Sequence, residues 1–293
     1  MRPILFFLLA VVGLSAATEA GKVVSVSADG WATIVHADGS ANFLRRFSEG
    51  DRKVGWTGRL VRYDAVTEGG ETVVARGIVS ADPEELRRVA EVTDVLRRET
   101  VDKGRLVTRM PNELMPNMAL WDQDGRLVMK KDLLGHAVAL NFIFTSCRVA
   151  RMCPASTACM KSLGDQLAKD PAAAGIRLVT ITFDPETDTP GQLRAYADGY
   201  GIDHARHRFL TGDTGQIKDL MRHYGIQTLR DDGTIVHNAA LIVITPEGRI
   251  AFRNEGPSFD AEEIARRLLS LEGGAGAIGG VVYLDIGGGA VTP

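Results

Sequence analysis

The sequence predicts an α/β protein in which a small β-barrel-like domain precedes a larger domain of alternating strands and helices. Between residues 22 and 80, short apolar runs are separated by breaks such as Asp38-Gly39 and Gly69-Gly70, which is typical of antiparallel strands joined by turns. From residue 106 onward, apolar runs rich in Val and Ile alternate with segments of helical periodicity, which indicates a sheet covered by helices. We therefore expect a β domain over 21–80, a helical connector over 81–105, an α/β domain over 106–272 and a Gly-rich tail over 273–293.

The elements of the first part follow from its local patterns. Strands are predicted over 23–26, 32–35, 56–61 and 72–79, where apolar residues alternate with polar ones. Asp82-Pro83 is a typical helix start. The apolar residues of this connector, which fall roughly on one face and predict the side that packs inward, are Leu86, Val89, Ala90 and Leu96. The opposite face is charged and should face solvent.

The larger domain has the element order of a thioredoxin-like α/β sandwich. A strand and turn over 115–125 return over 127–129, and residues 137–144 form an apolar run interrupted only by Asn141, which predicts a strand buried on both faces. Further strands are expected over 176–183, 209–210, 239–244 and 249–253, with helices after Pro154 and Pro190, over 214–224 and over 260–271. The Gly-rich tail is read as disordered or as a loosely added strand.

Cys147 and Cys153 lie on the short loop between the apolar strand and the first helix of this domain. Pro154 suits a first helical position, so Cys153 should lie at a helix N-terminus, where the dipole favours a thiolate. Arg148 and Arg151 add positive charge to the same loop. These features predict thiols of low pKa, which bind soft metals or exchange disulfides.

Composition and the N-terminus limit the location and the partners. A net charge of −3 gives no basic footprint for nucleic acid, and three cysteines among 293 residues are too few for a disulfide scaffold. Arg2 precedes an apolar stretch over 3–14 that is short for a membrane span and is followed by the small residues 15–17. We expect a secretory signal cut near Ala17 or Ala20, or alternatively an uncleaved anchor. Either one places the chain in the periplasm or on the membrane facing it, where thiols can be oxidised.

Four segments together resemble the Sco/SenC family of thioredoxin-fold copper proteins, across roughly residues 115–271. They are residues 144–147 with 153–154, residues 180–190, residues 209–212, and residues 235–238 before a strand and a Pro-Glu-Gly turn. The resemblance implies that Cys147, Cys153 and His237 bind one copper ion. It also implies a role in assembling the dinuclear copper site of cytochrome c oxidase, or in related periplasmic copper and thiol chemistry. The chain has five residues between its cysteines, whereas most members have three.

These three residue types suit copper. Copper(I) is a soft ion that thiolate sulfur holds well, and a neutral imidazole can complete the site, although the same ligands also hold copper(II). Since the cysteines must lose their protons, affinity should fall at acid pH. Asp184 could orient a ligand or meet a partner, while the alternative is that Asp184 and Asp188 cap the turn and the helix at Pro190.

The remaining cysteine and histidines carry weaker expectations. Cys159 is predicted to be a buried apolar filler on the first helix, with a resolving thiol as the alternative. The chain is also similar to several bacterial members of this family that place a small β domain before the thioredoxin fold, and in some of them that domain carries a copper motif rich in His and Met. This chain has His36 at a comparable position but no methionine over 37–47, so we expect its β domain to be structural or a docking surface.

Two functions compete on the sequence alone. The first is a copper metallochaperone that is loaded after a thiol reductant protein has reduced its cysteines, and that passes copper to an acceptor such as a cytochrome c oxidase subunit. The second is a thiol-disulfide oxidoreductase in which Cys147 attacks and Cys153 resolves. The wide cysteine spacing and the presence of His237 favour metal. A peroxidase is disfavoured because Thr145 lies two residues before Cys147, and a purely structural secreted domain is the remaining alternative.

Overall fold

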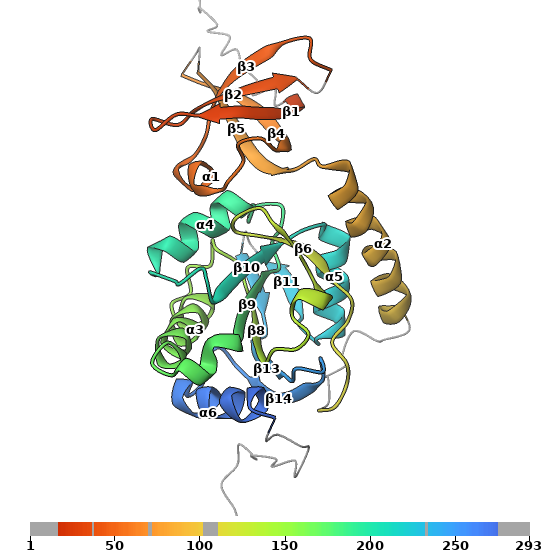
Figure 1. Cartoon of the computed structure of the whole chain (residues 1–293), viewed down its shortest axis with the longest axis vertical. Coiled ribbons are helices and arrows are strands. Elements are labelled where there is room, and N and C mark those ends of the chain that lie inside the picture. Colours follow the sequence, from red (N-terminus) through yellow and green to blue (C-terminus); the bar gives the residue numbers. More distant parts are fainter. Residues whose placement is uncertain (1–16, 37, 70–71, 102–110, 232–233, 275–293) are drawn as a thin grey trace, which may run out of the picture.

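The computed structural model describes residues 17–36, 38–69, 72–101, 111–231 and 234–274 (Figure 1). A small barrel lies at one end of the molecule, a larger α/β domain at the other, and helix α2 runs from the barrel along the side of the α/β domain. The expected boundary near residue 106, the apolar stretch over 3–14 and the tail over 275–293 lie outside the described residues. Among the residues that are described, no helix is both long and apolar enough to cross a membrane.

The barrel is a closed five-stranded sheet in the order β1-β2-β3-β5-β4. Its neighbouring strands are antiparallel except for β3 and β5, and Trp56, Tyr63 and Ile78 are buried in its core. The strands are β1 (Ala17–Val26), β2 (Trp31–His36), β3 (Asn42–Arg46), β4 (Leu60–Glu68) and β5 (Thr72–Ser80), with the short helix α1 (Glu49–Lys53) between β3 and β4.

Two expectations for the barrel were wrong. The strand expected over 56–61 begins only at Leu60, because Trp56 precedes the strand and fills the core from the segment after α1. Strand β3 was not expected, since it carries the charged Arg45. Arg45 is buried because Glu19 on β1 accepts a hydrogen bond of 2.8 Å from its guanidinium, and this pairing compensates the charge.

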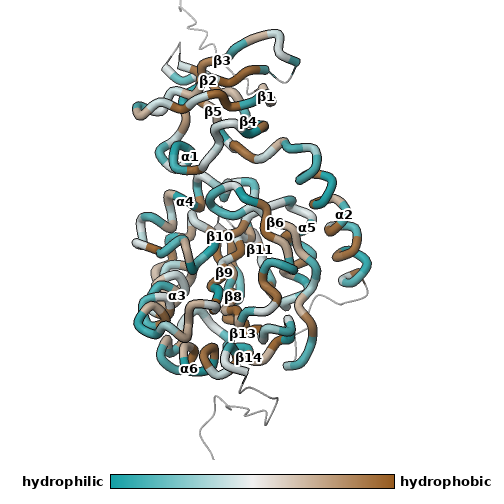
Figure 2. Tube along the Cα trace, in the orientation of Figure 1, coloured by the Kyte–Doolittle hydropathy of each residue, from teal (hydrophilic) through white to brown (hydrophobic). Residues whose placement is uncertain are grey.

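Helix α2 (Pro83–Thr100) begins as expected, with the Asp82 carboxylate accepting hydrogen bonds from the N–H groups of Glu84 and Glu85. Figure 2 shows that many of its residues are hydrophilic. Of the face expected to pack inward, Val89 and Leu96 are buried, whereas Leu86 is 42% exposed. The inward face is therefore narrower than its apolar pattern suggested.

The α/β domain is built on a seven-stranded sheet in the order β14-β13-β8-β9-β10-β6-β7. Strands β8, β9 and β10 are parallel to one another, and the outer pairs are antiparallel. Its strands are β6 (Ala119–Asp122), β7 (Leu127–Met129), β8 (Val138–Ile143), β9 (Arg177–Thr182), β10 (His207–Thr211), β13 (Ala240–Ile244) and β14 (Ile250–Glu255). Its helices are α3 (Cys153–Leu167), α4 (Pro190–Gly199), α5 (Thr214–His223) and α6 (Ala261–Glu272), with short 3-10 segments η1 (Lys130–Asp132) and η2 (Pro171–Gly175).

Strand β8 shows why the sheet is buried on both faces. Its residues alternate between two hydrophobic clusters: Ala139 packs with residues of α3 and α6, whereas Leu140 and Phe142 pack with residues of α4 and α5. All six residues of the strand are buried. The thioredoxin-like architecture expected from the element order is therefore present. The cysteine loop follows the carboxyl end of β8, an interior strand of this sheet.

A separate antiparallel hairpin, β11 (Thr228–Asp231) and β12 (Thr234–His237), was not expected. It forms its own two-stranded sheet, and its residues Leu229 and Val236 are 66% and 54% exposed. The sequence analysis missed this hairpin because its two runs are short and do not alternate regularly between apolar and polar residues. Its last residue is His237.

Candidate metal centre

The cysteine loop begins where β8 ends and finishes at the first residue of α3. Cys147 is half-buried, while Cys153 is 1% exposed and belongs to the main hydrophobic core. The backbone N–H of Cys147 donates to the Phe144 carbonyl at 3.4 Å, and that of Met152 donates to the Val149 carbonyl at 2.9 Å. These turns fold back the loop of five residues between the cysteines, and both sulfurs therefore lie at the same end of the sheet.

Asp188 anchors the start of this loop. Its buried carboxylate accepts hydrogen bonds from the Thr145 backbone N–H at 3.0 Å, the Thr145 hydroxyl at 2.5 Å and the Thr182 hydroxyl at 2.6 Å. Burial raises the pKa of Asp188 despite these bonds, which favour the charged form. The expectation that Asp188 caps the helix at Pro190 was wrong, since Thr189 is the N-cap of α4 and accepts from the Gln192 N–H.

Asp184 shapes the turn before this helix. Its carbonyl accepts hydrogen bonds from the N–H groups of Thr187 and Asp188, at 3.1 and 2.9 Å. The residue is 6% exposed, which leaves little of it for a partner to contact. Its participation in orienting a ligand stays a prediction.

His237 presents one defined ring nitrogen to the cysteines. Its Nδ1 lies 2.8 Å from the Asn238 carbonyl, which can only accept, so Nδ1 carries the proton and Nε2 keeps a free lone pair. That Nε2 lies 3.3 Å from the Cys153 sulfur. The ring packs against Phe183 and Phe144, with centroids 4.6 and 5.9 Å away, and burial lowers the pKa of His237, which favours the neutral imidazole that binds metals.

Asn238 fixes the hairpin that carries this histidine. Its side-chain oxygen accepts from the Gln227 N–H at 2.7 Å, and its amide donates to the Gly225 carbonyl at 3.0 Å. These bonds close the base of the hairpin onto the segment after α5. Asn238, Phe144 and Phe183 were not identified as functional from the sequence. The signal that could have found them is their position: Asn238 follows His237, Phe144 lies just before Cys147, and Phe183 follows the end of β9.

The structure brings the three expected ligands together. One potential ligand atom from each of Cys147, Cys153 and His237 lies within 4.8 Å of the others, and this is the single such His, Cys, Asp or Glu group within the described ranges. None of the cysteines is in a disulfide. Two sulfurs and an available imidazole nitrogen fit copper(I), because soft thiolate ligands and a neutral imidazole are the donors this ion prefers. Copper here is a cargo that the three side chains would hold.

Cys153 does not have the low pKa expected from its position at a helix N-terminus. Burial raises the pKa of its thiol well above the usual value, and the nearby Cys147 adds to this effect. The helix dipole therefore does not compensate for the apolar surroundings. In the metal-free reduced protein this thiol is protonated, so loading a metal must release a proton.

The other candidates stay apart from this centre. Cys159 is only half-buried on α3, whereas a buried apolar filler was expected. His36 lies 2.7 Å from Asp38 and packs edge-on against Phe43 within the barrel. His207 is buried, hydrogen-bonded to Thr180, and burial lowers its pKa to about 3.

The fold and the site define a thioredoxin-like protein with two thiols and one imidazole gathered at one end of its sheet. The family model described as SCO1/SenC matches residues 107–271 of this chain. The chain belongs to the SCO1/SenC family. The barrel lies outside the matched residues.

Curated relatives agree with this assignment. The chain is 28% identical over 133 residues to the SCO1 protein homolog of Bacillus subtilis, covering 44% of this chain and 67% of that protein. It is 30% identical over 135 residues to the mitochondrial SCO2 homolog of Danio rerio, covering 44% of this chain and 47% of that protein. A Stutzerimonas stutzeri protein, whose name includes the words copper-binding, is 28% identical over 159 residues, with 53% of this chain and 75% of that protein covered.

Solved structures support the fold. A SCO1/SenC family lipoprotein from Bacillus anthracis matches with a TM-score of 0.51 at 24% identity, covering 56% of this chain and 99% of that one. BsSco, described as a member of the Sco family of cytochrome c oxidase assembly proteins, matches with a TM-score of 0.50 at 24% identity, covering 57% of this chain and 98% of that one. At this identity the likeness establishes the thioredoxin-like fold.

Proposed function

We propose that this protein is an extracytoplasmic copper metallochaperone that holds one copper ion between Cys147, Cys153 and His237 and passes it to an apo-acceptor. The observation that carries the proposal is the convergence of Cys153 and His237, which are 84 positions apart in sequence yet have Sγ and Nε2 3.3 Å apart. Membership of the SCO1/SenC family supports copper as the ion. The acceptor proposed is the dinuclear copper site of a cytochrome c oxidase subunit, which is the role that the family resemblance implies.

The chemistry of the site suits uptake and release. Cys153 and His237 are held by the core and by neighbouring aromatic rings, while Cys147 is half-buried and next to the exposed Val149. An acceptor ligand could thus replace Cys147 first and take the ion by exchange. Because the Cys153 thiol binds its proton tightly, copper and protons compete for this sulfur, and affinity falls as the pH is lowered.

A thiol-disulfide oxidoreductase is the second candidate, and the two neighbouring free thiols favour it. In that reaction the Cys147 thiolate attacks a partner disulfide and Cys153 resolves the mixed disulfide. The partner gains two electrons and two protons, while Cys147 and Cys153 become a disulfide that a thiol reductant protein must restore. The buried Cys153 suits the resolving position because its thiol is shielded from direct attack.

Titration of the reduced protein with copper(I) against a colorimetric chelator separates these functions. Cys147→Ser, Cys153→Ser and His237→Ala should each lose the copper bound by the parent. Cys159→Ser and His36→Ala are the matched controls, since neither residue belongs to the cluster, and both should keep it. An insulin-reduction assay on the same proteins should show little activity.

The opposite pattern would replace the metallochaperone by the oxidoreductase. If His237→Ala binds copper as tightly as the parent while insulin reduction is rapid and depends on Cys147, the histidine is not a ligand and thiol exchange is the function. If copper binding is lost equally in Cys159→Ser, binding is not specific to the three-residue centre.

We also propose that the protein functions outside the cytoplasm. Strand β1 begins at Ala17 and pairs with β4 from that residue, and Glu19 bonds to Arg45 and Tyr63 within the barrel. If a signal is removed, a cut near Ala17 preserves this strand, whereas a cut near Ala20 removes Glu19. N-terminal sequencing of the protein from a periplasmic extract would test both the location and the cut.

A further inference from the structure

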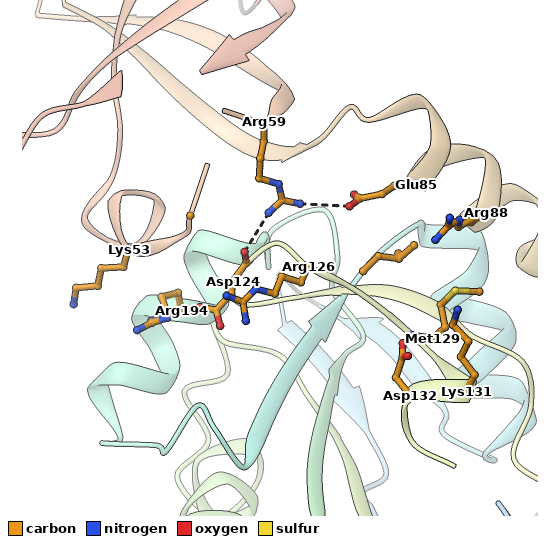
Figure 3. Close-up of a pocket in the computed structure, with 12 residues that line it drawn as sticks. Lys53, Arg59, Glu85, Arg88, Asp124, Arg126, Met129, Lys131, Asp132 and Arg194 are labelled. Atoms are coloured by element: carbon orange, nitrogen blue, oxygen red, sulfur yellow. Dashed lines mark hydrogen bonds and ion pairs between the residues drawn. The ribbon is translucent and has the colours of Figure 1, made fainter. Parts of the chain in front are cut away.

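A basic pocket lies at the junction of the barrel, α2 and the α/β domain (Figure 3), and none of its lining residues belongs to the cysteine loop. It has a volume of about 830 Å³, which is within the size range of small-molecule sites. Three of its lining residues are acidic and six are cationic, in a chain whose overall charge is negative. The cationic residues are Lys53, Arg59, Arg88, Arg126, Lys131 and Arg194.

The walls of the pocket are held in place by close contact between the two domains. Helix α1 of the barrel packs against α4, and a Cβ added to Gly50 would lie 1.9 Å from the Gly191 carbonyl oxygen. Lys53 on α1 donates to Asp198 on α4 at 2.8 Å. Arg59 reaches from the barrel to the Asp124 carbonyl at 3.3 Å, an interaction visible in Figure 3. The pocket is therefore formed before any ligand binds.

The acidic residues of the pocket are already engaged with protein groups. Asp124 is paired with Arg194. Glu85 accepts from the Trp121 indole N–H at 2.9 Å and lies 3.6 Å from Arg59, and Asp132 accepts from the Met129 N–H at 2.8 Å. Among the described residues, none of these three carboxylates pairs with Arg126 or Lys131, and the cationic residues of the pocket outnumber them.

Three cationic side chains of the pocket can contact a ligand: Arg88 on α2, Arg126 in the turn before β7, and Lys131 in η1. Arg126 and Lys131 are exposed, and neither forms an ion pair with any residue in the described part of the chain. Arg88 on α2 meets Glu84 through Nε at 3.0 Å, which leaves its two terminal nitrogens available. Guanidinium groups bind carboxylate and phosphate oxygens through paired hydrogen bonds, and a lysine adds a point charge.

We propose that this interdomain pocket binds a small organic polyanion that carries two or more phosphate or carboxylate groups. Arg126 and Lys131 contact its anionic groups, and Arg88 contacts them from α2. Leu127 and Met129 line the same pocket and offer apolar surface to the body of such a molecule. The proposal is independent of the copper centre, since none of its residues lies in the cysteine loop or the histidine hairpin.

Isothermal titration calorimetry of the metal-free, reduced protein tests it, with pyrophosphate and citrate as the probes. Each probe should bind saturably, and the double variant Arg126→Ala/Lys131→Ala should weaken binding about tenfold or more, since two charge-assisted contacts are lost. Because both side chains are exposed and without ion pairs, the variant should fold as the parent does, which circular dichroism checks.

The matched control is Arg266→Ala/Lys169→Ala, which removes one exposed arginine and one exposed lysine elsewhere on the α/β domain. It should leave the affinity unchanged. The proposal is overturned if neither probe binds saturably, if both double variants weaken binding equally, or if the protein binds phosphatidylglycerol vesicles while neither free probe binds.

Discussion

The two sides of the candidate metal centre are built in different ways. The cysteine side is continuous with the central sheet, because Cys153 lies in the main core and Asp188 ties Thr145 to the end of β9. The histidine side is a small hairpin outside that sheet, held by the hydrogen bonds of Asn238 and by packing on Phe144 and Phe183. The positions of the thiols therefore depend on the global fold, whereas the position of the imidazole depends on a few local contacts. Changes on the cysteine side should therefore cost stability, and changes on the histidine side should cost mainly copper affinity.

The largest loss of stability is expected from Asp188→Ala. This change leaves the N–H and hydroxyl of Thr145 and the hydroxyl of Thr182 without their acceptor inside the protein. Each orphaned buried donor is costly, and together they should lower the free energy of unfolding by about 4 kcal/mol. Urea denaturation followed by circular dichroism measures it.

The control for this change is Asp165→Ala, which removes an exposed carboxylate paired with Lys161 four residues before it. Such surface pairs contribute about 0 to 1 kcal/mol. If Asp188→Ala costs no more than the control, the hydrogen bonds of Asp188 do not anchor the cysteine loop, and the contrast between the two sides of the centre fails.

A smaller effect of opposite sign is expected from Asp51→Asn, at the contact between the barrel and α4. Asp51 is 6% exposed, its Oδ1 has no hydrogen-bond partner among the described residues, and burial raises its pKa from 3.8 to about 6. Since the folded state holds this proton more tightly than the unfolded state, the contribution of Asp51 to stability is present below pH 3.8 and is lost as the pH rises to about 6.

The amide variant cannot ionise, so it should avoid this loss. At pH about 7 it should be more stable than the parent by roughly 2 to 3 kcal/mol, and the difference should vanish near pH about 4. Melting temperatures across this pH range provide the measurement, while copper affinity should not change. A constant difference at every pH would mean that Asp51 does not titrate between the two states.

The sequence predicted well what local patterns determine. Strands β8 and β9 were recognisable because runs of apolar and β-branched residues are needed where both faces of a strand are buried. The helix beginning at Cys153 followed from Pro154 and the spacing of Met160, Leu163 and Leu167. Cys147 and Cys153 were singled out by their place between a buried strand and a helix start, whereas His237 and the shared copper ion came from the family resemblance.

The features that were missed depend on distant contacts. Thr145 and Asp188 are 43 positions apart, and no local pattern shows that one carboxylate would hold the loop. The pKa of Cys153 was also mispredicted for this reason. Its place at a helix start predicted a low pKa, whereas burial in the surrounding core raises it. The hairpin that carries His237 lacks the periodicity of a buried element.

The smallest effect on stability, with a clear effect on copper, is expected from Asn238→Ala. The change removes the bonds to the Gln227 N–H and the Gly225 carbonyl, which close the base of the hairpin. Gln227 is exposed and its N–H can bond to water, whereas Gly225 is buried and its carbonyl loses a partner, so the loss in unfolding free energy should be about 1 to 2 kcal/mol. The backbone carbonyl of residue 238 remains, so the proton stays on His237 Nδ1. The ring, however, is no longer held near Cys153, and copper(I) affinity should fall about tenfold.

Asn254→Ala is the control, since its amide contacts lie in the segment around Glu255 and Ser258. Competition with a copper(I) chelator measures the affinity, and an unchanged value in Asn238→Ala would show that the aromatic packing of Phe144 and Phe183 alone positions the histidine.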